Sequence, residues 1–380
     1  MRGKRWWALL AALTLLLAAC GGGSSEETSA PETTAAPSGT EEDTSTETTA
    51  APAEGEDEGA EAEGGEGPHF IYITPNPIGE NEFLQMGETG TQAAAERLGG
   101  TAETFESTDP SSSRANIEAA VEAAPDIIVL TTFQLTDMAV EFASANPDQK
   151  FILIDDCPPE GQPENLYCVG FREHEGAYLL GIMAGNLTET NKIGSVVALD
   201  IPFFHRWSDS FYLGAQSVNP DLEPDTQVFI GGDNPFADPA RAKEQALSLA
   251  AQGLDQIFSV GAASDMGVFE AAQEQGFMTY GTDVNNCPVA PEYIVDNNLK
   301  LVDNAVQTAI DLVMSGEATP FTSVGLAEGG VGVMALDDER LADSQCLVAQ
   351  HPDIVEQVRE AAEGIISGEI EVPDPLAAAG

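Results

Sequence analysis

Aromatic and acidic side chains recur at one kind of place in this sequence, directly after short apolar runs that read as buried strands. Aromatic rings stack on a flat ligand, and carboxylates accept paired hydroxyl hydrogen bonds. Together they would suit a small polyol that carries a flat ring. The candidate aromatic residues are Phe83, Phe133, Phe203, Phe204 and Trp207, and the candidate acids are Asp155, Asp265 and Asp283.

Each candidate also has a purely structural interpretation. A phenylalanine such as Phe133 can be a core side chain, and an aspartate such as Asp265 can cap the helix that follows it. No G-x-S-x-G, G-x-x-x-x-G-K-[ST] or H-E-x-x-H segment accompanies them, and the four histidines make no metal-ligand spacing with the cysteines. We therefore expect a binding site without catalysis, cofactor or metal, and regard an esterase or nucleosidase as a weak alternative.

The elements that must position these residues alternate, from His69 onward, between short apolar runs and helical stretches, which is typical of parallel βαβ units. Two successive runs of this kind predict two similar lobes with the ligand at the carboxyl ends of the strands. The pattern predicts strands over 70–73, 101–106, 127–130, 151–154, 167–171, 193–199, 228–230, 256–260 and 277–281. It predicts helices over 82–98, 113–124, 136–145, 173–187, 207–218, 239–252, 266–275, 300–314 and 352–366.

The five cysteines fall into two groups. Cys20 lies near the N-terminus, whereas Cys157, Cys168, Cys287 and Cys346 lie in the body. In an exported protein four cysteines indicate two disulfides, for which three connectivities exist. The simplest pairing joins Cys157 to Cys168 and Cys287 to Cys346.

The charge balance is strongly acidic: the 380 residues carry 14 basic and 64 acidic side chains, a formal net charge of −50. This excludes nucleic acid as a partner, because phosphate neutralisation requires a Lys/Arg surface. An anionic membrane surface would repel the body for the same reason. Hydrophobic residues make up 42% of the chain, which is enough to bury a core.

The first 68 residues read as a targeting segment and a tether. Residues 1–19 combine a basic start with a 14-residue apolar run, which is typical of a secretory signal and short for a membrane span. They end in Leu17-Ala18-Ala19-Cys20, which resembles the lipobox of bacterial lipoproteins and implies a lipidated Cys20; an ordinary signal cleaved at a small residue is the alternative. Residues 20–68 are acidic and nearly devoid of large apolar groups, so we expect a disordered tether that holds the body off the membrane.

The segment Phe171-Arg-Glu-His-Glu-Gly-Ala-Tyr-Leu-Leu-Gly-Ile-Met-Ala-Gly185 resembles the basic membrane protein family, the nucleoside-binding lipoproteins of ABC importers. Further matches follow in order, among them Pro147-Asp-x-Lys-Phe-x-x-Ile-Asp155, Gly281-Thr-Asp283 and Gly364-Ile-Ile-Ser-Gly-Glu-Ile-x-Val-Pro, so the resemblance covers roughly residues 70 to 373. It implies an α/β fold of the type I periplasmic-binding class, with two Rossmann-like lobes joined by three crossovers and a ligand captured by hinge closure.

The resemblance also implies roles for single residues. Family members clamp the base between aromatic rings and hold the ribose hydroxyls with carboxylates. Asp283 matches the aspartate on the ribose, Lys300 matches a lysine near the cleft, and Phe83 matches the aromatic residue of the opening Asp-x-x-Phe-Asn motif. Here Glu80 and Leu84 replace the aspartate and the asparagine of that motif, which leaves the exact ligand open.

We therefore expect lobe 1 to span residues 69–171 and 284–320, and lobe 2 to span residues 172–283 and 321–380. The expected function is that of a monomeric substrate-binding protein, lipid-anchored on the extracytoplasmic face of the cell membrane. It would capture a nucleoside, with a purine favoured, and deliver it to an ABC permease. The alternatives are a sugar-binding protein of the same fold and a ligand sensor for a membrane signalling partner.

Overall fold

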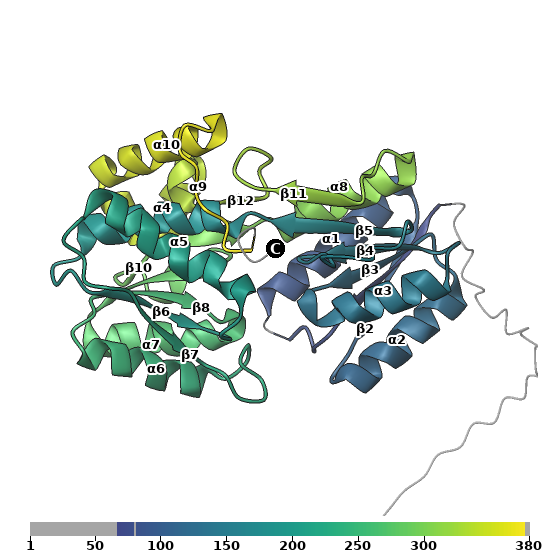
Figure 1. Cartoon of the computed structure of the whole chain (residues 1–380), viewed down its shortest axis with the longest axis horizontal. Coiled ribbons are helices and arrows are strands. Elements are labelled where there is room, and N and C mark those ends of the chain that lie inside the picture. The colour runs from purple at the N-terminus through teal and green to yellow at the C-terminus, as the bar shows by residue number, and fades with distance from the viewer. Residues whose placement is uncertain (1–66, 80, 377–380) are drawn as a thin grey trace, which may run out of the picture. The chain divides into compact units, whose positions relative to one another are not determined.

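The computed structural model describes residues 67–79 and 81–376, which all belong to one compact unit of the chain (Figure 1). Within this unit the chain forms two six-stranded sheets with helices packed on them, so the expected two-lobed α/β fold is confirmed. The predicted signal peptide, the lipidated Cys20 and the tether lie outside the described residues, as does Glu80. None of the described helices is both long and apolar enough to cross a membrane.

The first sheet contains six parallel strands. In the order in which they pair, they are β11 (Phe321–Val324), β5 (Leu166–Phe171), β4 (Lys150–Ile154), β3 (Ile127–Thr131), β1 (His69–Thr74) and β2 (Thr101–Glu106). Successive side chains of a strand point to opposite faces, so Phe70 and Tyr72 enter one core while Ile71 and Ile73 enter another. One face is covered by α1 (Glu82–Leu98) and α8 (Val302–Ser315), the other by α2 (Pro110–Ala123) and α3 (Thr136–Ala145).

The second sheet repeats this arrangement, with one antiparallel edge strand. Its strands pair in the order β12 (Val331–Gly332), β10 (Ile294–Lys300), β9 (Met278–Asp283), β8 (Gln256–Val260), β6 (Ile193–Val197) and β7 (Thr226–Phe229). On one face lie α4 (Glu173–Leu187) and α5 (Pro202–Val218), and on the other α6 (Pro239–Ala251) and α7 (Asp265–Gln275). Two more helices, α9 (Asp338–Ser344) and α10 (Pro352–Ser367), follow near the C-terminus, and α10 packs on α4.

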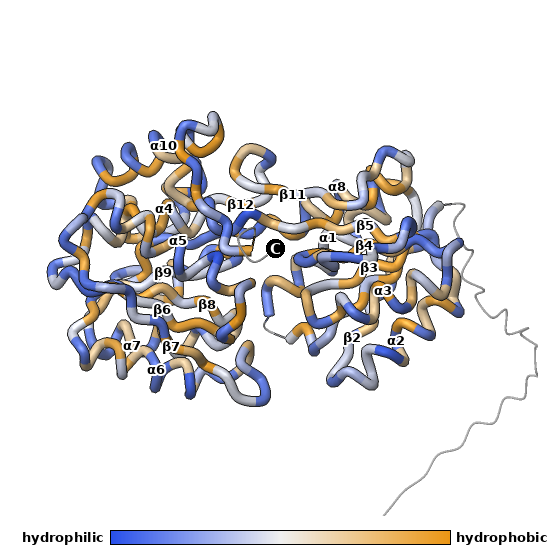
Figure 2. Tube along the Cα trace, viewed as in Figure 1, coloured by the Kyte–Doolittle hydropathy of each residue, from blue (hydrophilic) through white to orange (hydrophobic). Residues whose placement is uncertain are grey.

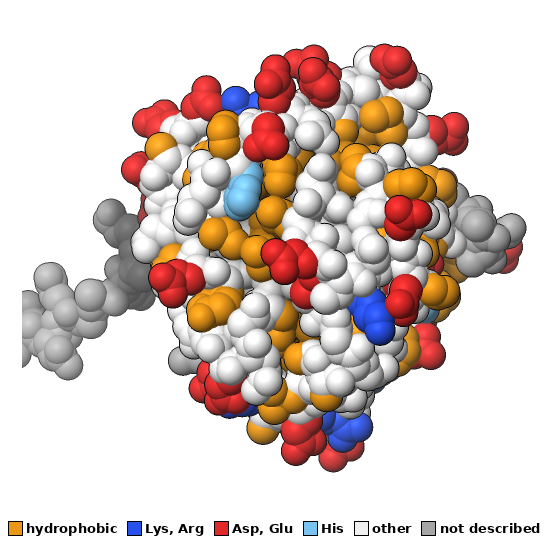
Figure 3. Space-filling view, turned by 90° about the vertical axis from the view of Figure 1, so that its left-hand side faces the viewer, with side chains coloured by type: hydrophobic (Ala, Val, Ile, Leu, Met, Phe, Trp, Pro, Cys, Tyr) orange, Lys and Arg blue, Asp and Glu red, His pale blue; other side chains and the backbone are white. Residues whose placement is uncertain are grey.

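The hydropathy of the chain follows this layering (Figure 2). Central strands such as β3 and β8 are buried along their whole length and are mostly apolar, because parallel strands covered by helices are buried on both faces. Outer turns are hydrophilic, and acidic side chains are scattered over the end of the molecule formed by the second sheet and its helices (Figure 3). The large negative charge is therefore spread over a solvated surface there.

Helices α4 and α5 touch through their backbones. A Cβ atom on Gly181 would lie 2.0 Å from the carbonyl oxygen of Phe211, and one on Gly214 would lie 2.0 Å from that of Tyr178. Only glycine permits such an approach. This contact holds α5, whose first turns reach the ligand pocket described below, firmly against α4.

The helix expected over 207–218 begins five residues earlier, at Pro202. Proline is favoured in a first helical turn because the N–H that it lacks would have no partner within the helix. Phe203 and Phe204 therefore lie on the first turn of α5 and Trp207 lies one turn later, so the three rings pack together.

Strand β10 lacks the apolar pattern of a buried strand, and it lies in a different sheet from the one that the expected lobe limits imply. Its central residues are Asp296, Asn297 and Asn298, whereas a buried strand is normally recognised by an apolar run. The tertiary structure supplies partners for this polar run: the carboxylate of Asp296 accepts hydrogen bonds from the N–H groups of Met334 and Ala335, at 2.8 and 3.0 Å. β10 pairs with β9 in the second sheet, while β11 pairs with β5 in the first. At these two strands the structure differs from the limits that assigned 284–320 to lobe 1 and 321–380 to lobe 2.

Three segments cross between the sheets: residues 171–173 lead from β5 to α4, residues 300–302 from β10 to α8, and residues 324–331 from β11 to β12. They are tied to one another. The N–H of Arg172 donates to the carbonyl oxygen of Val324 at 2.9 Å, and the N–H of Leu301 donates to the carbonyl oxygen of Gly330 at 3.0 Å. The crossings therefore form one connected hinge region.

One of the two expected disulfides is present. Cys287 and Cys346 are bonded, with their Cα atoms 4.9 Å apart, which confirms that pairing. The pairing of Cys157 with Cys168 is wrong, because both are free thiols. The side chain of Gln162 contacts both, with its Oε1 atom 3.5 Å from Cys157 Sγ and its Nε2 atom 3.5 Å from Cys168 Sγ. Sequence spacing alone does not decide whether two thiols bond.

Candidate ligand-binding site

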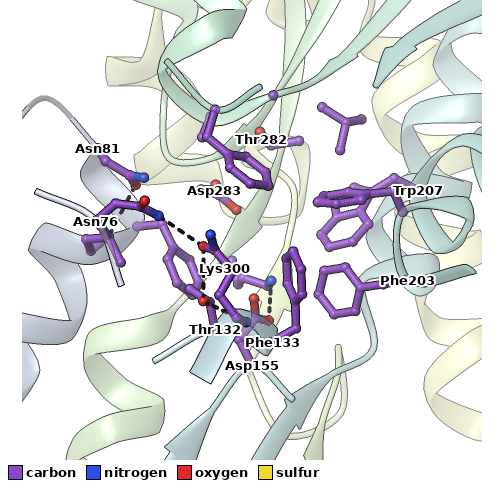
Figure 4. Close-up of a pocket in the computed structure, with 18 residues that line it drawn as sticks. Asn76, Asn81, Thr132, Phe133, Asp155, Phe203, Trp207, Thr282, Asp283 and Lys300 are labelled. Carbon is purple, nitrogen blue, oxygen red and sulfur yellow. Dashed lines mark hydrogen bonds and ion pairs between the residues drawn. The ribbon is translucent and has the colours of Figure 1, made fainter. Parts of the chain in front are cut away.

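The carboxyl ends of strands from both sheets meet at one pocket, drawn in Figure 4. About 620 Å³ in it, open solvent included, is free of protein atoms. From the side of the first sheet it is lined by Asn76, Asn81, Phe83, Leu84, Thr132, Phe133, Gln134 and Asp155. From the side of the second sheet it is lined by Phe203, Phe204, Trp207, Phe236, Val260, Gly261, Ala262, Thr282, Asp283 and Lys300.

Eight of the nine candidate residues line this pocket, and they come from widely separated parts of the chain: Phe83, Phe133, Asp155, Phe203, Phe204, Trp207, Asp283 and Lys300. The ninth, Asp265, lines a neighbouring polar cavity instead. Its side chain is buried and accepts a hydrogen bond from Thr282 Oγ1 at 3.1 Å. Asp265 therefore contacts Thr282, a residue of the lining, but does not itself line the pocket.

Aromatic rings from the two lobes meet across the pocket. The ring of Phe133, just after β3, has its centroid 5.6 Å from that of Phe203 and 6.4 Å from that of Phe236. Within the second lobe, the Trp207 ring lies 5.3 Å from Phe203 and 5.7 Å from Phe204. These separations are those of tilted and edge-to-face aromatic pairs. Such rings can stack on a flat ligand.

Lys300, the last residue of β10, places a buried ammonium among these rings (Figure 4). Its Nζ atom lies 4.9 Å from the centroid of Trp207 and 5.1 Å from that of Phe83, within the range of cation–π attraction. The same atom is 2.5 Å from Asp155 Oδ1 and 2.9 Å from Glu173 Oε1. Burial opposes the charged form of Lys300, but the nearby carboxylates outweigh it and raise the pKa, so the ammonium stays protonated.

The two pocket carboxylates are held in an environment that favours retention of a proton. Burial raises the pKa of Asp155 to about 7 and that of Asp283 to about 6, against the opposing charge of Lys300. Both residues also have positive φ angles, 78° and 68°, as do Thr132 at 74° and Ala262 at 53°. Residues other than glycine rarely adopt this conformation, and such strain concentrates at functional sites.

Sequence reasoning missed several polar groups that the first lobe contributes. Asn81 caps α1 by accepting a hydrogen bond from the N–H of Leu84, and Asn76 donates to Gln134 at 3.0 Å. It also missed Phe236, which lies on the loop between β7 and α6. The one available signal for Phe236 was an aromatic residue after an apolar strand, the same signal that identified the other rings.

Comparisons with known proteins agree with the geometry. The family described as "ABC transporter substrate-binding protein PnrA-like" (Bmp) matches residues 70–375. An uncharacterized lipoprotein of Pyrococcus furiosus is 29% identical over 282 residues, covering 66% of this chain and 71% of the relative. Basic membrane protein A of Borreliella burgdorferi is 30% identical over 223 residues, covering 57% of this chain and 65% of the relative.

A solved structure shows the same fold. The ABC transporter solute-binding protein from Aeropyrum pernix K1 superimposes with a TM-score of 0.69 at 28% identity, covering 80% of this chain and 94% of that chain. Proteins of the matched family are the extracytoplasmic substrate-binding components of ABC transporters and are not enzymes. Since the family match spans both sheets and the whole lining of the pocket, this chain belongs to the PnrA-like (Bmp) family of ABC transporter substrate-binding proteins.

Proposed function

We propose that this protein captures a nucleoside, with a purine base favoured, and delivers it to an ABC permease. The proposal is carried by one observation: aromatic rings from both lobes share a pocket with the partly buried Asp283 and the buried side chains of Asp155 and Lys300. The rings offer faces to the base, and the carboxylates accept hydrogen bonds from paired ribose hydroxyls. The resemblance to nucleoside-binding lipoproteins supports the same assignment.

A ligand with a flat ring fits this pocket better than a sugar alone. Six of its eighteen lining residues are aromatic, and they come from both sides of the pocket. A sugar offers mainly hydroxyls and would leave much of this ring surface without a flat partner. A sugar-binding protein of the same fold is therefore the rival that the binding experiment must exclude.

Capture would use the two contacts that already link the lobes. Phe133, after a strand of the first sheet, meets Phe203 of α5, and Asp155, after the next strand, meets Lys300 of the second sheet. Opening about the hinge would separate both pairs and expose the ring faces, and closure would enclose the ligand between them. The closed form is the one that we expect the permease to recognise.

We also propose that the protein acts as a monomer anchored through a lipid on Cys20. The residues before Cys20 and the lipoprotein name of the Pyrococcus furiosus relative support the anchor. The variant Cys20→Ser should move the protein from the membrane fraction to the soluble extracytoplasmic fraction. Unchanged fractionation would contradict the anchor.

The decisive experiment is calorimetric titration of the full chain, freed of bound ligand, with purine and pyrimidine nucleosides, free bases and sugars. We expect a nucleoside to bind at micromolar concentration or tighter, about −8 kcal/mol or better. Asp283→Asn should weaken this binding, whereas Asp311→Asn, at an exposed pair with Arg97, should not. Binding of sugars alone would transfer the function to the rival, and no binding across the panel would contradict the proposed ligand class.

A further inference from the structure

A line of buried ion pairs runs from the pocket lysine to the segment that follows α10. Glu173, at the start of α4, has one carboxylate oxygen 2.9 Å from Lys300 Nζ and the other 2.7 Å from Arg206 Nη1. Arg206, on α5, then faces Asp374 with two hydrogen bonds, of 3.0 Å from Nε and 2.9 Å from Nη2. Four charged side chains thus connect the pocket with the C-terminal segment.

Three of these four groups are buried and depend on their neighbours, whereas Asp374 at the outer end is partly exposed. Glu173 is 1% exposed, Lys300 3% and Arg206 7%. A buried ion that loses its partner is left uncompensated, which costs several kcal/mol or forces the side chain to move. Burial alone would raise the pKa of Glu173, but the charges of Lys300 and Arg206 lower it below the usual value, so Glu173 is ionised and binds both cations.

The C-terminal segment supplies the outer end of this line. After α10 the chain, yellow in Figure 1, turns back toward α5, and Val372 in this segment is buried. The carboxylate of Asp374 engages the guanidinium of Arg206 in the paired geometry that fixes an arginine most strongly, and also accepts from the N–H of Leu376 at 3.0 Å. Arg206 is thereby held where only its third nitrogen reaches Glu173.

We propose that Arg206 and Asp374 are positioning residues for the ligand pocket. They hold Glu173, and through it the ammonium of Lys300, although neither lines the pocket. The segment around Asp374 is thus part of the binding machinery. The effect on affinity rests on the proposed nucleoside function, whereas the effect on Lys300 does not.

The chain contains a probe for the position of Lys300. Its three tryptophans are Trp6, Trp7 and Trp207, and the ring of Trp207 lies 4.9 Å from Lys300 Nζ. In the full chain carrying Trp6→Phe and Trp7→Phe, the emission of Trp207 therefore reports on the nearby ammonium. The variant Lys300→Met, measured in the same background, defines the emission when the ammonium is absent.

The test compares four variants in this background, without ligand. Asp374→Asn and Arg206→Gln should shift the Trp207 emission toward that of Lys300→Met. Asp374→Glu, which keeps the carboxylate, should restore most of the original emission. Asp338→Asn is the matched control, because Asp338 pairs with Arg359 at 2.7 Å in an exposed position of the same lobe. It should leave the emission unchanged.

A second arm measures nucleoside affinity by calorimetry, well below the unfolding temperature. We expect Asp374→Asn and Arg206→Gln to weaken binding by roughly threefold to thirtyfold, and Asp374→Glu to recover most of it. A purely structural role would lower the unfolding temperature but leave both emission and affinity unchanged, and would overturn the inference. A change in the Trp207 emission without a change in nucleoside affinity, or the reverse, would also overturn the inference.

The proposed nucleoside function and the proposed positioning role can be contradicted independently of each other. If the unmodified chain binds no nucleoside, the proposed function is wrong, and the emission arm alone decides whether Asp374 positions Lys300. If the unmodified chain binds a nucleoside but Asp374→Asn has the emission of the control, the positioning role is wrong and the proposed function stands.

Discussion

The two walls of the pocket are built in different ways. The second lobe presents a group of rings on the first turns of α5, with Phe203 and Phe204 5.2 Å apart, and a lysine that ion pairs hold from behind. The first lobe presents separate residues at the ends of strands, most of them polar, such as Asn76 and Thr132. The second wall is a packed unit of rings, whereas the first consists mainly of polar residues linked by a few hydrogen bonds.

This difference indicates a division of labour in binding. The rings of α5 and Lys300 contact one another within the second lobe, so that wall is preorganised before the lobes close. Phe133 and Asp155 of the first lobe complete the site only by reaching across to it. Changes in the second wall should therefore cost both stability and affinity, while changes in the first should cost mainly affinity.

Removal of the disulfide should give the largest effect on stability. Cys287 and Cys346 are 59 residues apart, and closing a loop of that length stabilises the folded state by about 4 kcal/mol. Replacing both with serine should lower the free energy of unfolding by that amount in denaturant titrations. Cys157→Ser, at a free thiol of the first lobe, should cost less than about 1 kcal/mol. Equal losses of unfolding free energy in the two variants would contradict the view that the second lobe is stabilised more strongly than the first.

Replacement of Lys300 should come next. Lys300→Met leaves the carboxylates of Asp155 and Glu173 buried without their shared cation, which should cost about 3 kcal/mol of stability. Affinity for a nucleoside should fall by about a hundredfold, measured by calorimetry. The control is Lys243→Met, because Lys243 pairs with the exposed Glu270 and Glu274 and such surface pairs contribute about 1 kcal/mol or less.

The rings of the two walls should respond differently to truncation. Phe204→Ala removes a buried ring from the group on α5, so the free energy of unfolding should fall by about 3 kcal/mol. Phe133→Ala removes a half-buried ring at the start of a loop and should change stability by less than about 1 kcal/mol while still weakening ligand binding. Comparable losses of stability for both variants would show that the first wall is packed as tightly as the second.

The stability of the protein should also depend on pH. Burial raises the pKa of Asp155 to about 7 and that of Asp265 to about 8, above the values near 4 of an unfolded chain. The folded state therefore keeps protons that the unfolded state releases, and stability should fall as the pH rises from about 4 to 8. Calorimetric unfolding temperatures should show this decline, and Asp265→Asn should make it shallower.

High salt separates this effect from repulsion at the acidic surface. Salt screens exposed charges but acts much less on buried ones, so the part of the slope due to Asp265 should persist in 1 M salt. An Asp265→Asn variant with the slope of the unmodified chain would show that this carboxyl does not hold its proton in the folded state.

Much of the fold could be predicted, because its elements are encoded by local patterns. The helices Thr136–Ala145 and Glu173–Leu187 and the strand Gln256–Val260 have the predicted limits at both ends, since apolar periodicity and turn residues lie within each segment. Strand β10 was not predicted because Asp296, Asn297 and Asn298 form a polar run. Only partners elsewhere in the chain make that run suitable for a buried strand.

The candidate site shows the same difference between residues that a local sequence pattern identifies and residues that depend on distant partners. Phe133, Asp155 and Asp283 were identified because each follows a strand, and parallel strands bring their carboxyl ends to one edge. The outer ion pairs of Arg206 and Asp374 gave no such signal, because 168 residues separate the two side chains. Their importance for the pocket comes from burial, which sequence alone does not specify.

The sequence by itself determined the alternation of strands and helices, the two lobes, the family and most of the aromatic and charged residues that line the pocket, since these depend on periodicity and on motifs of neighbouring residues. The tertiary structure alone decided which strand enters which sheet, which cysteines bond and which charges are paired. Those outcomes depend on distances between residues far apart in the chain, and two side chains become partners only when folding brings them within a few ångströms and removes the water between them.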